Sequence, residues 1–218
     1  MKSAGNDIVA LNAIDIQRTR DARFYSKFIT DSELAIYQQQ SQALSFEIFV
    51  WLLWSVKESA YKYLQRHKAG MIFSPAKIVI QQINVPTNNS LTNFFGAEWE
   101  SDYTFENFYS GTVTSGSHQL YFRSKLHHEF IASVVNGDDR FENVYWGIRL
   151  INNVDSEHQS RAVRELVLTK LQSMLGVDDL QISKSETGYP VVLNSETSLD
   201  IAISFAHHDK WVGYSFAL

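Results

Sequence analysis

The sequence predicts an α+β protein with two similar lobes, in each of which a long helix packs on a small, mostly antiparallel sheet. Three observations support this prediction: two long stretches show helical periodicity, several strand-like runs follow each of them, and a turn-rich segment separates the two sets. That segment, Asn136-Gly137-Asp138-Asp139, predicts a first lobe of residues 1–139 and a second lobe of residues 140–218. The chain has 218 residues, 44% of them hydrophobic, which is enough for two small cores.

The first lobe is expected to begin with a strand and three helices. Asp7–Leu11 is rich in Ile, Val and Leu and predicts a short buried strand. A basic helix over Ile16–Phe28 follows, and Thr30 with Glu33 predicts the capping box of a second helix. The long helix covers Ala43–His67, because its apolar residues recur at intervals of three and four.

Strands complete the first lobe. Ser74-Pro75 ends the helical pattern, and the polar segment Asn84–Asp102 predicts either an irregular connection or a loop with one strand. Ser115-Gly116 is a turn signal between the strand-like runs Tyr103–Tyr109 and Gln119–Ser124. The strand-like runs are Lys77–Ile83, Tyr103–Tyr109, Gln119–Ser124 and Phe130–Val135.

The second lobe repeats the order of strand, helix and further strands. Val144–Leu150 predicts the first strand. A helix follows, with Ser156 and Gln159 as its capping box, an apolar side, and Gly176 as its C-terminal stop. The remaining strands are expected at Leu180–Ser183, Val191–Leu193, Ile201–Phe205 and Trp211–Phe216.

Composition excludes several classes of protein. The net charge is -5 and the chain has no long basic run, so no nucleic-acid partner is expected. The absence of cysteine excludes disulfides, thiolate zinc sites and cysteine nucleophiles. The N-terminal stretch lacks the apolar core of a signal peptide, and the apolar run Phe46–Val56 is too short to span a bilayer. We therefore expect a soluble, cytoplasmic protein with no membrane partner.

A carboxylate stands between two lysines at the end of the apolar run FEIFVWLLWSVKESAYK, as Lys57, Glu58 and Lys62. Considered alone, Glu58 and Lys62 are four residues apart on a helix, where an exposed ion pair contributes only ~0.2–0.5 kcal/mol. Asp7 alone fits a turn or capping residue, and His207 alone fits a structural histidine. The individual residues therefore leave the function open.

Five segments nevertheless form an ordered set: Gly5–Val9, Arg23–Leu34, Trp54–Lys62, Gly188–Pro190 and Ile203–Ala217. The set resembles the motifs of the 4′-phosphopantetheinyl transferases. WSVKESAYK is similar to the family's most specific motif, W-x-x-K-E-[AS]-x-x-K, and GNDIV to its opening G-x-D-I strand. RFYSKFITDSEL is similar to the segment that leads into T-x-x-E-L, GYP to the G-[KR]-P turn, and ISFAHH to the S-x-[ST]-H strand. The resemblance implies the family's pseudo-dimeric, two-lobed fold.

The order of the motifs has two explanations. In the large single-chain type of this family, the G-x-P and S-x-x-H motifs come first, whereas here they come last. The chain is therefore either a circular permutation of the large type or an enlarged version of the small holo-acyl-carrier-protein synthase type, which has this motif order. Its length favours permutation, which proteins tolerate where the termini are close together on the surface. Two fused lobes make a monomer the simpler expectation.

The resemblance implies a reaction and a metal site. The reaction is transfer of the 4′-phosphopantetheine arm from coenzyme A to a serine of an apo acyl or peptidyl carrier protein, with release of 3′,5′-ADP. Asp7 and Glu58 are implied as ligands of Mg²⁺, with Mn²⁺ as the alternative, since hard cations take carboxylate oxygens. Lys62 is implied to stabilise charge on the pyrophosphate. The base that takes the serine proton is either Glu58 or a metal-bound water.

The resemblance also implies contacts with coenzyme A and with the carrier protein. The residues implied for coenzyme binding are His207, Ser204 and Gly188 of the second lobe, together with Lys57 and Lys62 of the long helix. The basic helix carries Arg18, Arg20 and Arg23, which either meet an acidic carrier protein or form a solvated face.

Three positions depart from the family pattern. Val9 stands where many large-type members have a second acidic residue, Ala206 replaces the Ser or Thr before His207, and Tyr189 replaces the basic residue of the G-x-P turn. Lys184 on the neighbouring strand is a candidate to compensate for Tyr189. These departures leave an alternative open: a degenerate, non-catalytic member that binds coenzyme A or a carrier protein.

Overall fold

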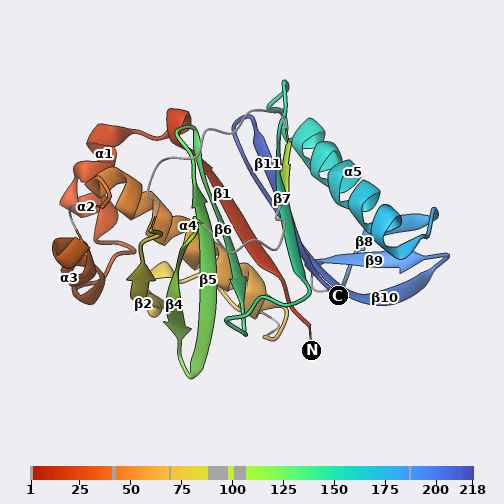
Figure 1. Ribbon diagram of the computed structural model, residues 1–218, viewed down its shortest axis with the longest axis horizontal. Helices are drawn as coiled ribbons and strands as arrows, with labels where there is room; N and C mark the ends of the chain where they lie inside the picture. The colour runs from red at the N-terminus through yellow and green to blue at the C-terminus, as the bar shows by residue number, and fades with distance from the viewer. Residues whose placement is uncertain (1, 41–42, 69, 88–97, 101–106, 187) are drawn as a thin grey trace.

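The computed structural model describes residues 2–40, 43–68, 70–87, 98–100, 107–186 and 188–218 (Figure 1). It confirms the predicted α+β class: two antiparallel sheets face each other, and a long helix covers the outer side of each. Three clusters of buried apolar residues fill the spaces between these four layers. The described residues include no helix that is long and apolar enough to cross a membrane.

The first sheet has five strands in the order β1-β6-β5-β4-β2. Every neighbouring pair is antiparallel. The short 3₁₀ turns η1 (Leu11–Ala13) and η2 (Pro75–Lys77) lie at the end of β1 and at the start of β2. The strands are β1 (Gly5–Ala10), β2 (Ile78–Asn84), β4 (Tyr109–Ser115), β5 (His118–Leu126) and β6 (Phe130–Asn136).

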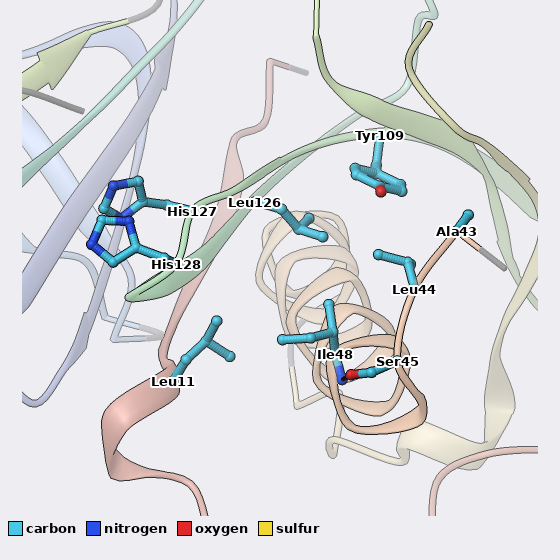
Figure 2. A pocket seen from close by; sticks show the side chains of 9 residues that line it. All are labelled: Leu11, Ala43, Leu44, Ser45, Ile48, Tyr109, Leu126, His127 and His128. Atoms are coloured by element: carbon cyan, nitrogen blue, oxygen red, sulfur yellow. Dashed lines mark hydrogen bonds between the residues drawn. The ribbon is translucent and has the colours of Figure 1, made fainter. Parts of the chain in front are cut away.

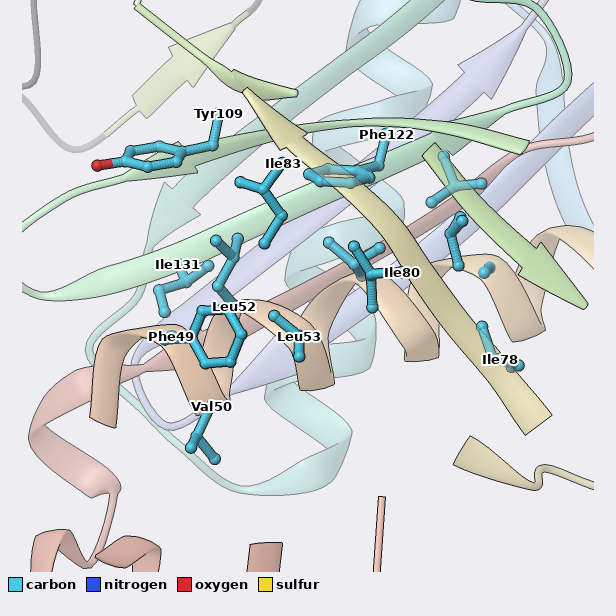
Figure 3. Packing of buried hydrophobic residues seen from close by; sticks show 14 of the residues in the cluster. Phe49, Val50, Leu52, Leu53, Ile78, Ile80, Ile83, Tyr109, Phe122 and Ile131 are labelled. Atoms are coloured by element: carbon cyan, nitrogen blue, oxygen red, sulfur yellow. The ribbon is translucent and has the colours of Figure 1, made fainter. Parts of the chain in front are cut away.

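The long helix α4 (Phe46–Gln65) packs across this sheet and confirms the helix predicted over Ala43–His67. It begins where the Ser45 hydroxyl accepts a hydrogen bond from the backbone N–H of Ile48 at 3.4 Å, which satisfies one of the donors left free at a helix start. Its buried apolar side chains meet those of the strands, as Figure 3 shows for Phe49, Leu52 and Leu53 against Ile80, Ile83, Phe122 and Ile131. Burial of this face is the main stabilising term for the helix.

The basic helix predicted over Ile16–Phe28 is wrong in one respect: it is two short helices, α1 (Ile16–Arg20) and α2 (Ala22–Tyr25). Asp21 separates them, because its carboxylate accepts a hydrogen bond from the backbone N–H of Arg23 and thereby caps a new helix. The next helix, α3 (Asp31–Gln40), confirms the predicted capping box: Glu33 accepts from the N–H of Thr30, and Thr30 accepts from the N–H of Glu33.

Only the end of the strand predicted over Tyr103–Tyr109 falls within the described residues. There β4 begins at Tyr109 and continues to Ser115. Residues 101–106 lie outside the described residues, as do residues 88–97 of the predicted irregular connection. The turn at Ser115-Gly116 is confirmed, and the single strand expected in the connection is β3 (Glu98–Glu100).

The second sheet has six strands in the order β3-β7-β11-β10-β9-β8. The helix α5 (Ser156–Leu175) covers it, but Asp155 rather than Ser156 is the N-cap, because the Asp155 carboxylate accepts from the N–H of His158 at 2.8 Å. Gly176 ends the helix with a left-handed φ of 65°, as predicted. The other strands are β7 (Val144–Leu150), β8 (Leu180–Lys184), β9 (Pro190–Asn194), β10 (Thr197–His208) and β11 (Trp211–Ala217).

The two sheets meet along β1. This strand pairs with β6 in the first sheet. One of its faces packs on α4, and the opposite face packs on β10 and β11 of the second sheet (Figure 1). Because β3 pairs with β7, residues 98–100 belong to the second sheet although they precede residue 139. The division into two lobes at residue 139 stays a prediction. The packing of β1 on β10 brings the second sheet next to α4.

Candidate active site

A close approach between β1 and α4 creates the candidate site. A Cβ atom on Gly5 would lie 2.1 Å from the backbone oxygen of Ser59 and 2.7 Å from the backbone nitrogen of Tyr63. Only glycine therefore fits where the strand touches the helix. Ser59 is itself small, and its hydroxyl donates to the carbonyl of Ser55 at 2.8 Å. These contacts place the residue two positions after Gly5, Asp7, against the charged end of α4.

Asp7 and Lys62 form an ion pair at this contact. The Lys62 ammonium lies 3.1 Å from Asp7 Oδ1 and donates a second hydrogen bond to the carbonyl of Asn6 at 2.9 Å. Asp7 is 5% exposed, and its other oxygen, Oδ2, is buried and accepts no hydrogen bond from an N–H or hydroxyl group of the residues that the structure describes. A buried carboxylate oxygen of this kind needs a proton or a cation.

Glu58 lies beside Asp7, one helical turn before Lys62. Burial, followed by the charge of Asp7 and a hydrogen bond with it, raises the pKa of the Glu58 carboxyl from 4.5 to about 7, against the opposing charge of Lys62. Two acidic side chains therefore share one site, although they are far apart in the sequence and lie on a strand and a helix. The structure thus brings together Asp7, Glu58 and Lys62.

The second lobe contributes His207 to the same space. Desolvation lowers the pKa of the His207 imidazole, the charge of Lys62 lowers it further, and the charge of Glu58 acts in the opposite direction. His207 lies near the end of β10, the strand that packs on β1. The site is therefore built from α4 and β1 on one side and β10 on the other.

A comparison with protein families identifies the group to which these residues belong. The model of the 4′-phosphopantetheinyl transferase superfamily matches residues 3–122, which is more than half of the chain. The chain belongs to this superfamily. Comparisons with curated proteins and with solved structures gave no match.

The matched part of this phosphopantetheinyl transferase superfamily member runs from β1 into β5. It includes Asp7, Glu58 and Lys62, but not β10 with His207. The superfamily consists of transferases, and in general these use coenzyme A and a divalent metal. The roles of the individual residues in this member remain proposals.

The residues present fit a divalent cation. Asp7 Oδ2 is a buried acceptor without a donor among the described residues, and Glu58 supplies a second carboxylate against it. Two carboxylates held this close repel each other when both are ionised, and a cation between them removes the repulsion. Mg²⁺ prefers an all-oxygen donor set, in which one or two carboxylates are completed by water and phosphate oxygens. Val9, the position of the missing third acid, is buried in the core at 2% exposure and adds no ligand.

The raised pKa of Glu58 predicts how stability depends on pH. Between its ordinary value of 4.5 and about 7, the metal-free folded protein keeps a proton that the unfolded chain releases. Folding stability should therefore fall as pH rises through this range. Glu58→Gln has no titrating carboxyl at this position. When both proteins are measured in EDTA, the melting temperature of wild type should therefore fall more between about pH 5 and about pH 8 than that of the variant. A gap between the two proteins that does not change with pH would contradict the assigned environment, and Mg²⁺ should restore wild type at the higher pH.

Gly5→Ala should disrupt the contact that aligns the site. The added methyl would meet backbone atoms of α4, so strand and helix must separate, at a cost of about 1–3 kcal/mol in unfolding free energy. Gly116→Ala is the control, since a Cβ there meets no atom within 4 Å. Urea unfolding measures both variants. Gly116→Ala is destabilised only by the left-handed backbone conformation at this position. A larger loss of unfolding free energy for Gly116→Ala than for Gly5→Ala would contradict the close approach of β1 and α4 as the constraint.

Lys57 does not face the candidate site. Its side chain is fully buried on the other side of α4, and its ammonium lies 2.9 Å from the Glu33 carboxylate. It also donates to the carbonyls of Phe28 at 2.5 Å and Pro75 at 3.2 Å. Burial lowers the pKa of Lys57, and the Glu33 charge opposes this shift. The expected phosphate contact of Lys57 is therefore corrected: this lysine joins three segments of the first lobe.

Two other expected coenzyme contacts, Ser204 and Gly188, differ in their surroundings. Ser204 is 5% exposed, and its hydroxyl accepts a hydrogen bond from the backbone N–H of Asn6 at 3.3 Å, which ties β10 to β1. His208, next to His207, does the same with the N–H of Ala10 at 3.0 Å. Gly188 is exposed in the turn before β9. These positions give no direct support to coenzyme binding by Ser204, whereas Gly188 remains accessible.

Arg66 is a residue of this region that the sequence did not indicate. It caps α4 one turn after Lys62, and its Nη2 donates to the carbonyls of Pro190, at 2.8 Å, and Ile203. The ring of Tyr189 lies over its guanidinium, 4.6 Å away. Its hydrogen-bond partners are more than 120 residues away in the sequence. The only sequence signal for Arg66 is its spacing of four residues from Lys62, which places both on one side of the helix.

A pocket elsewhere in the first lobe is separate from these residues. It has a volume of about 310 Å³, and Figure 2 shows Leu11, Leu44, Ile48 and Leu126 pointing into it while the rings of His127 and His128 point away. The two histidines and Glu129 have potential ligand atoms within 4.8 Å of one another. However, His127 Nδ1 accepts a hydrogen bond from the Glu129 N–H, whereas a histidine that binds a metal usually donates from its second nitrogen.

Proposed function

We propose that the protein transfers the 4′-phosphopantetheine arm of coenzyme A to a serine of an apo acyl or peptidyl carrier protein, with Mg²⁺ as cofactor. The observation that carries this proposal is the carboxylate pair of Asp7 and Glu58 with Lys62 one turn away, inside the segment that matches the superfamily. When bound by the two carboxylates, Mg²⁺ would neutralise charge on the pyrophosphate.

In the proposed reaction the serine oxygen forms a bond to the phosphorus that carries the pantetheine arm, and the bond from that phosphorus to 3′,5′-ADP breaks. The serine proton is accepted either by Glu58 or by a water at the cation site, the two bases that the family motif implies. Lys62, oriented by Asp7, stabilises the charge that develops on the leaving phosphate. His207 holds a further phosphate of coenzyme A from the second lobe.

The carrier protein is expected to approach the exposed arginines near α1 and α2. Arg18 and Arg23 are exposed, and the guanidinium of Arg18 lies 4.9 Å from the centre of the Phe24 ring. Arg20 is paired with Glu47, so it offers less charge to a partner. Positive charge on this face would attract an acidic carrier to a protein whose net charge is negative. A monomeric state and a cytoplasmic location remain predictions.

The alternative is a non-catalytic member that binds coenzyme A or a carrier protein. Buried Val9 and Ala206 favour it, because neither position can supply the polar group found in many family members. The two functions are separated by incubating the protein with coenzyme A, Mg²⁺ and a panel of apo carrier proteins, followed by intact-mass measurement. Transfer predicts that at least one carrier gains the arm, whereas coenzyme binding without any gain of mass would support the alternative.

A further inference from the structure

The second sheet is attached to α4 at the place where its own hydrogen bonding is interrupted. The last paired residues of β9 and β10 on this side are Val191 and Ala202. The next residue of β9 is Pro190, which has no N–H to donate. Arg66 donates from Nη2 to the carbonyls of both Pro190 and Ile203, so a side chain of α4 supplies the donor that the strands lack.

Tyr189 completes this attachment. Its ring covers the guanidinium at 4.6 Å, a geometry in which the positive charge is attracted to the face of the ring. The ring of Tyr189 thus packs against the guanidinium, while Nη2 of the same group donates hydrogen bonds to the two carbonyls. No carboxylate among the described residues pairs with Arg66. Within the described part of the chain, backbone carbonyls and an aromatic face surround its positive charge.

The position of Arg66 links this attachment to the candidate site. Glu58, Lys62 and Arg66 are spaced four residues apart and therefore lie along one side of α4. On the opposite side of the site, β10 runs from Ile203, which Arg66 holds, to His207, which experiences the charges of Lys62 and Glu58. Arg66 thus joins α4, which carries Glu58 and Lys62, to β10, which carries His207.

We propose that Arg66 is a positioning residue that holds the second lobe, through the Tyr189-Pro190 turn and β10, in the arrangement that binds coenzyme A. This inference rests on the proposed function. It explains why a tyrosine can replace the basic residue of the G-x-P turn: the positive charge comes from Arg66, and Tyr189 orients it. Lys184, the earlier candidate for compensation, is not needed for this role.

The mechanism predicts a specific kinetic signature. Without Arg66 the lobes would spend less time in the binding arrangement, and apparent affinity falls in proportion to the population of the competent state. Saturating coenzyme A would restore that arrangement, because it binds to both sides. Arg66→Met should therefore raise the KM for coenzyme A by about tenfold and change kcat by less than about threefold. Tyr189→Phe should resemble wild type, and Tyr189→Ala should show part of the effect.

Arg164→Met is the matched control. Arg164 is also half-buried, donates to a sheet carbonyl, that of Ile182 at 3.2 Å, and lies 5.7 Å from the ring of Phe205. However, both of these contacts join α5 to strands of its own lobe, β8 and β10, and neither involves α4. Its removal should lower the melting temperature without raising the KM. An equal rise in KM for both variants would overturn the proposal, since general destabilisation would then explain it.

Two further measurements separate the possible outcomes. With 3′-dephospho-coenzyme A as substrate, Arg66→Met should raise the KM by the same factor, whereas a smaller rise would indicate direct contact with the 3′-phosphate and overturn a positioning role. Calorimetric Kd values for coenzyme A should show the same tenfold difference, about 1.4 kcal/mol, even if wild type transfers nothing. In that case the proposed function fails and the role of Arg66 stands, whereas equal Kd values would overturn the role itself.

Discussion

Glu58→Gln and Asp7→Asn should each reduce phosphopantetheine transfer by ~10³-fold or more, while the fold is retained. Either change removes one of the two negative charges that would hold the cation, and neither changes the size of the side chain. Loss of a preorganised charge at the reacting group typically lowers kcat by about 10²–10³-fold, and loss of a metal ligand adds to this. Initial rates measured by mass spectrometry, with circular dichroism as the check of folding, give the comparison.

Glu47→Gln is the control for this prediction. Glu47 lies on the same helix, is 9% exposed and is paired with Arg20, so like Glu58 it is a carboxylate of α4 with a charged neighbour. It lies at the opposite end of α4, away from Asp7, and its loss should leave the rate of transfer unchanged. Wild-type rates in Glu58→Gln, or an equal loss in Glu47→Gln, would contradict the assigned metal ligands.

Lys57→Met should destabilise the protein by about 3–5 kcal/mol, because it leaves the Glu33 carboxylate buried without its cation. Glu33 also accepts hydrogen bonds from the backbone N–H groups of Thr30 and Ile80, both at 2.8 Å, so it cannot easily leave its place. Urea unfolding gives the free energies. The double variant Lys57→Met/Glu33→Gln should be less destabilised than the sum of the single variants, since the unpaired charge is then absent.

Lys2→Met supplies the comparison for the buried pair. Lys2 is 3.2 Å from Asp200, but both side chains are well exposed, and exposed pairs contribute only about 0–1 kcal/mol. A loss for Lys57→Met no larger than that for Lys2→Met would show that the buried ion pair does not hold the first lobe together.

The sequence predicted the elements that have a strong local signal. The apolar spacing of α4 identified the helix, and Gly176 identified the end of α5, because periodicity and left-handed glycines are properties of short segments. The single helix over Ile16–Phe28 failed for a local reason: an aspartate at position 21 offers the backbone an alternative partner. An aspartate six residues after the first cap, Asp15, was the available signal.

The candidate site was only partly predictable. Asp7, Glu58 and Lys62 were found through a family motif, and the structure places them together. The same motif includes Lys57, yet a lysine beside a site residue on a helix points to another face, and its burial depends on Glu33 and Pro75 from other segments. Arg66 depends on strands more than 120 residues away. Contacts of this kind arise from tertiary packing and leave no spacing in the sequence.

The most direct test of the central claim joins the two products of the proposed reaction. An apo carrier protein is incubated with coenzyme A and the protein, with Mg²⁺ or with EDTA, and the arm on the carrier and the released 3′,5′-ADP are measured in the same sample. We predict equal amounts of both products with Mg²⁺ and neither with EDTA. Release of 3′,5′-ADP without gain of the arm, or bound coenzyme A with no product on any carrier, would contradict the assignment of Asp7, Glu58 and Lys62 to phosphopantetheine transfer.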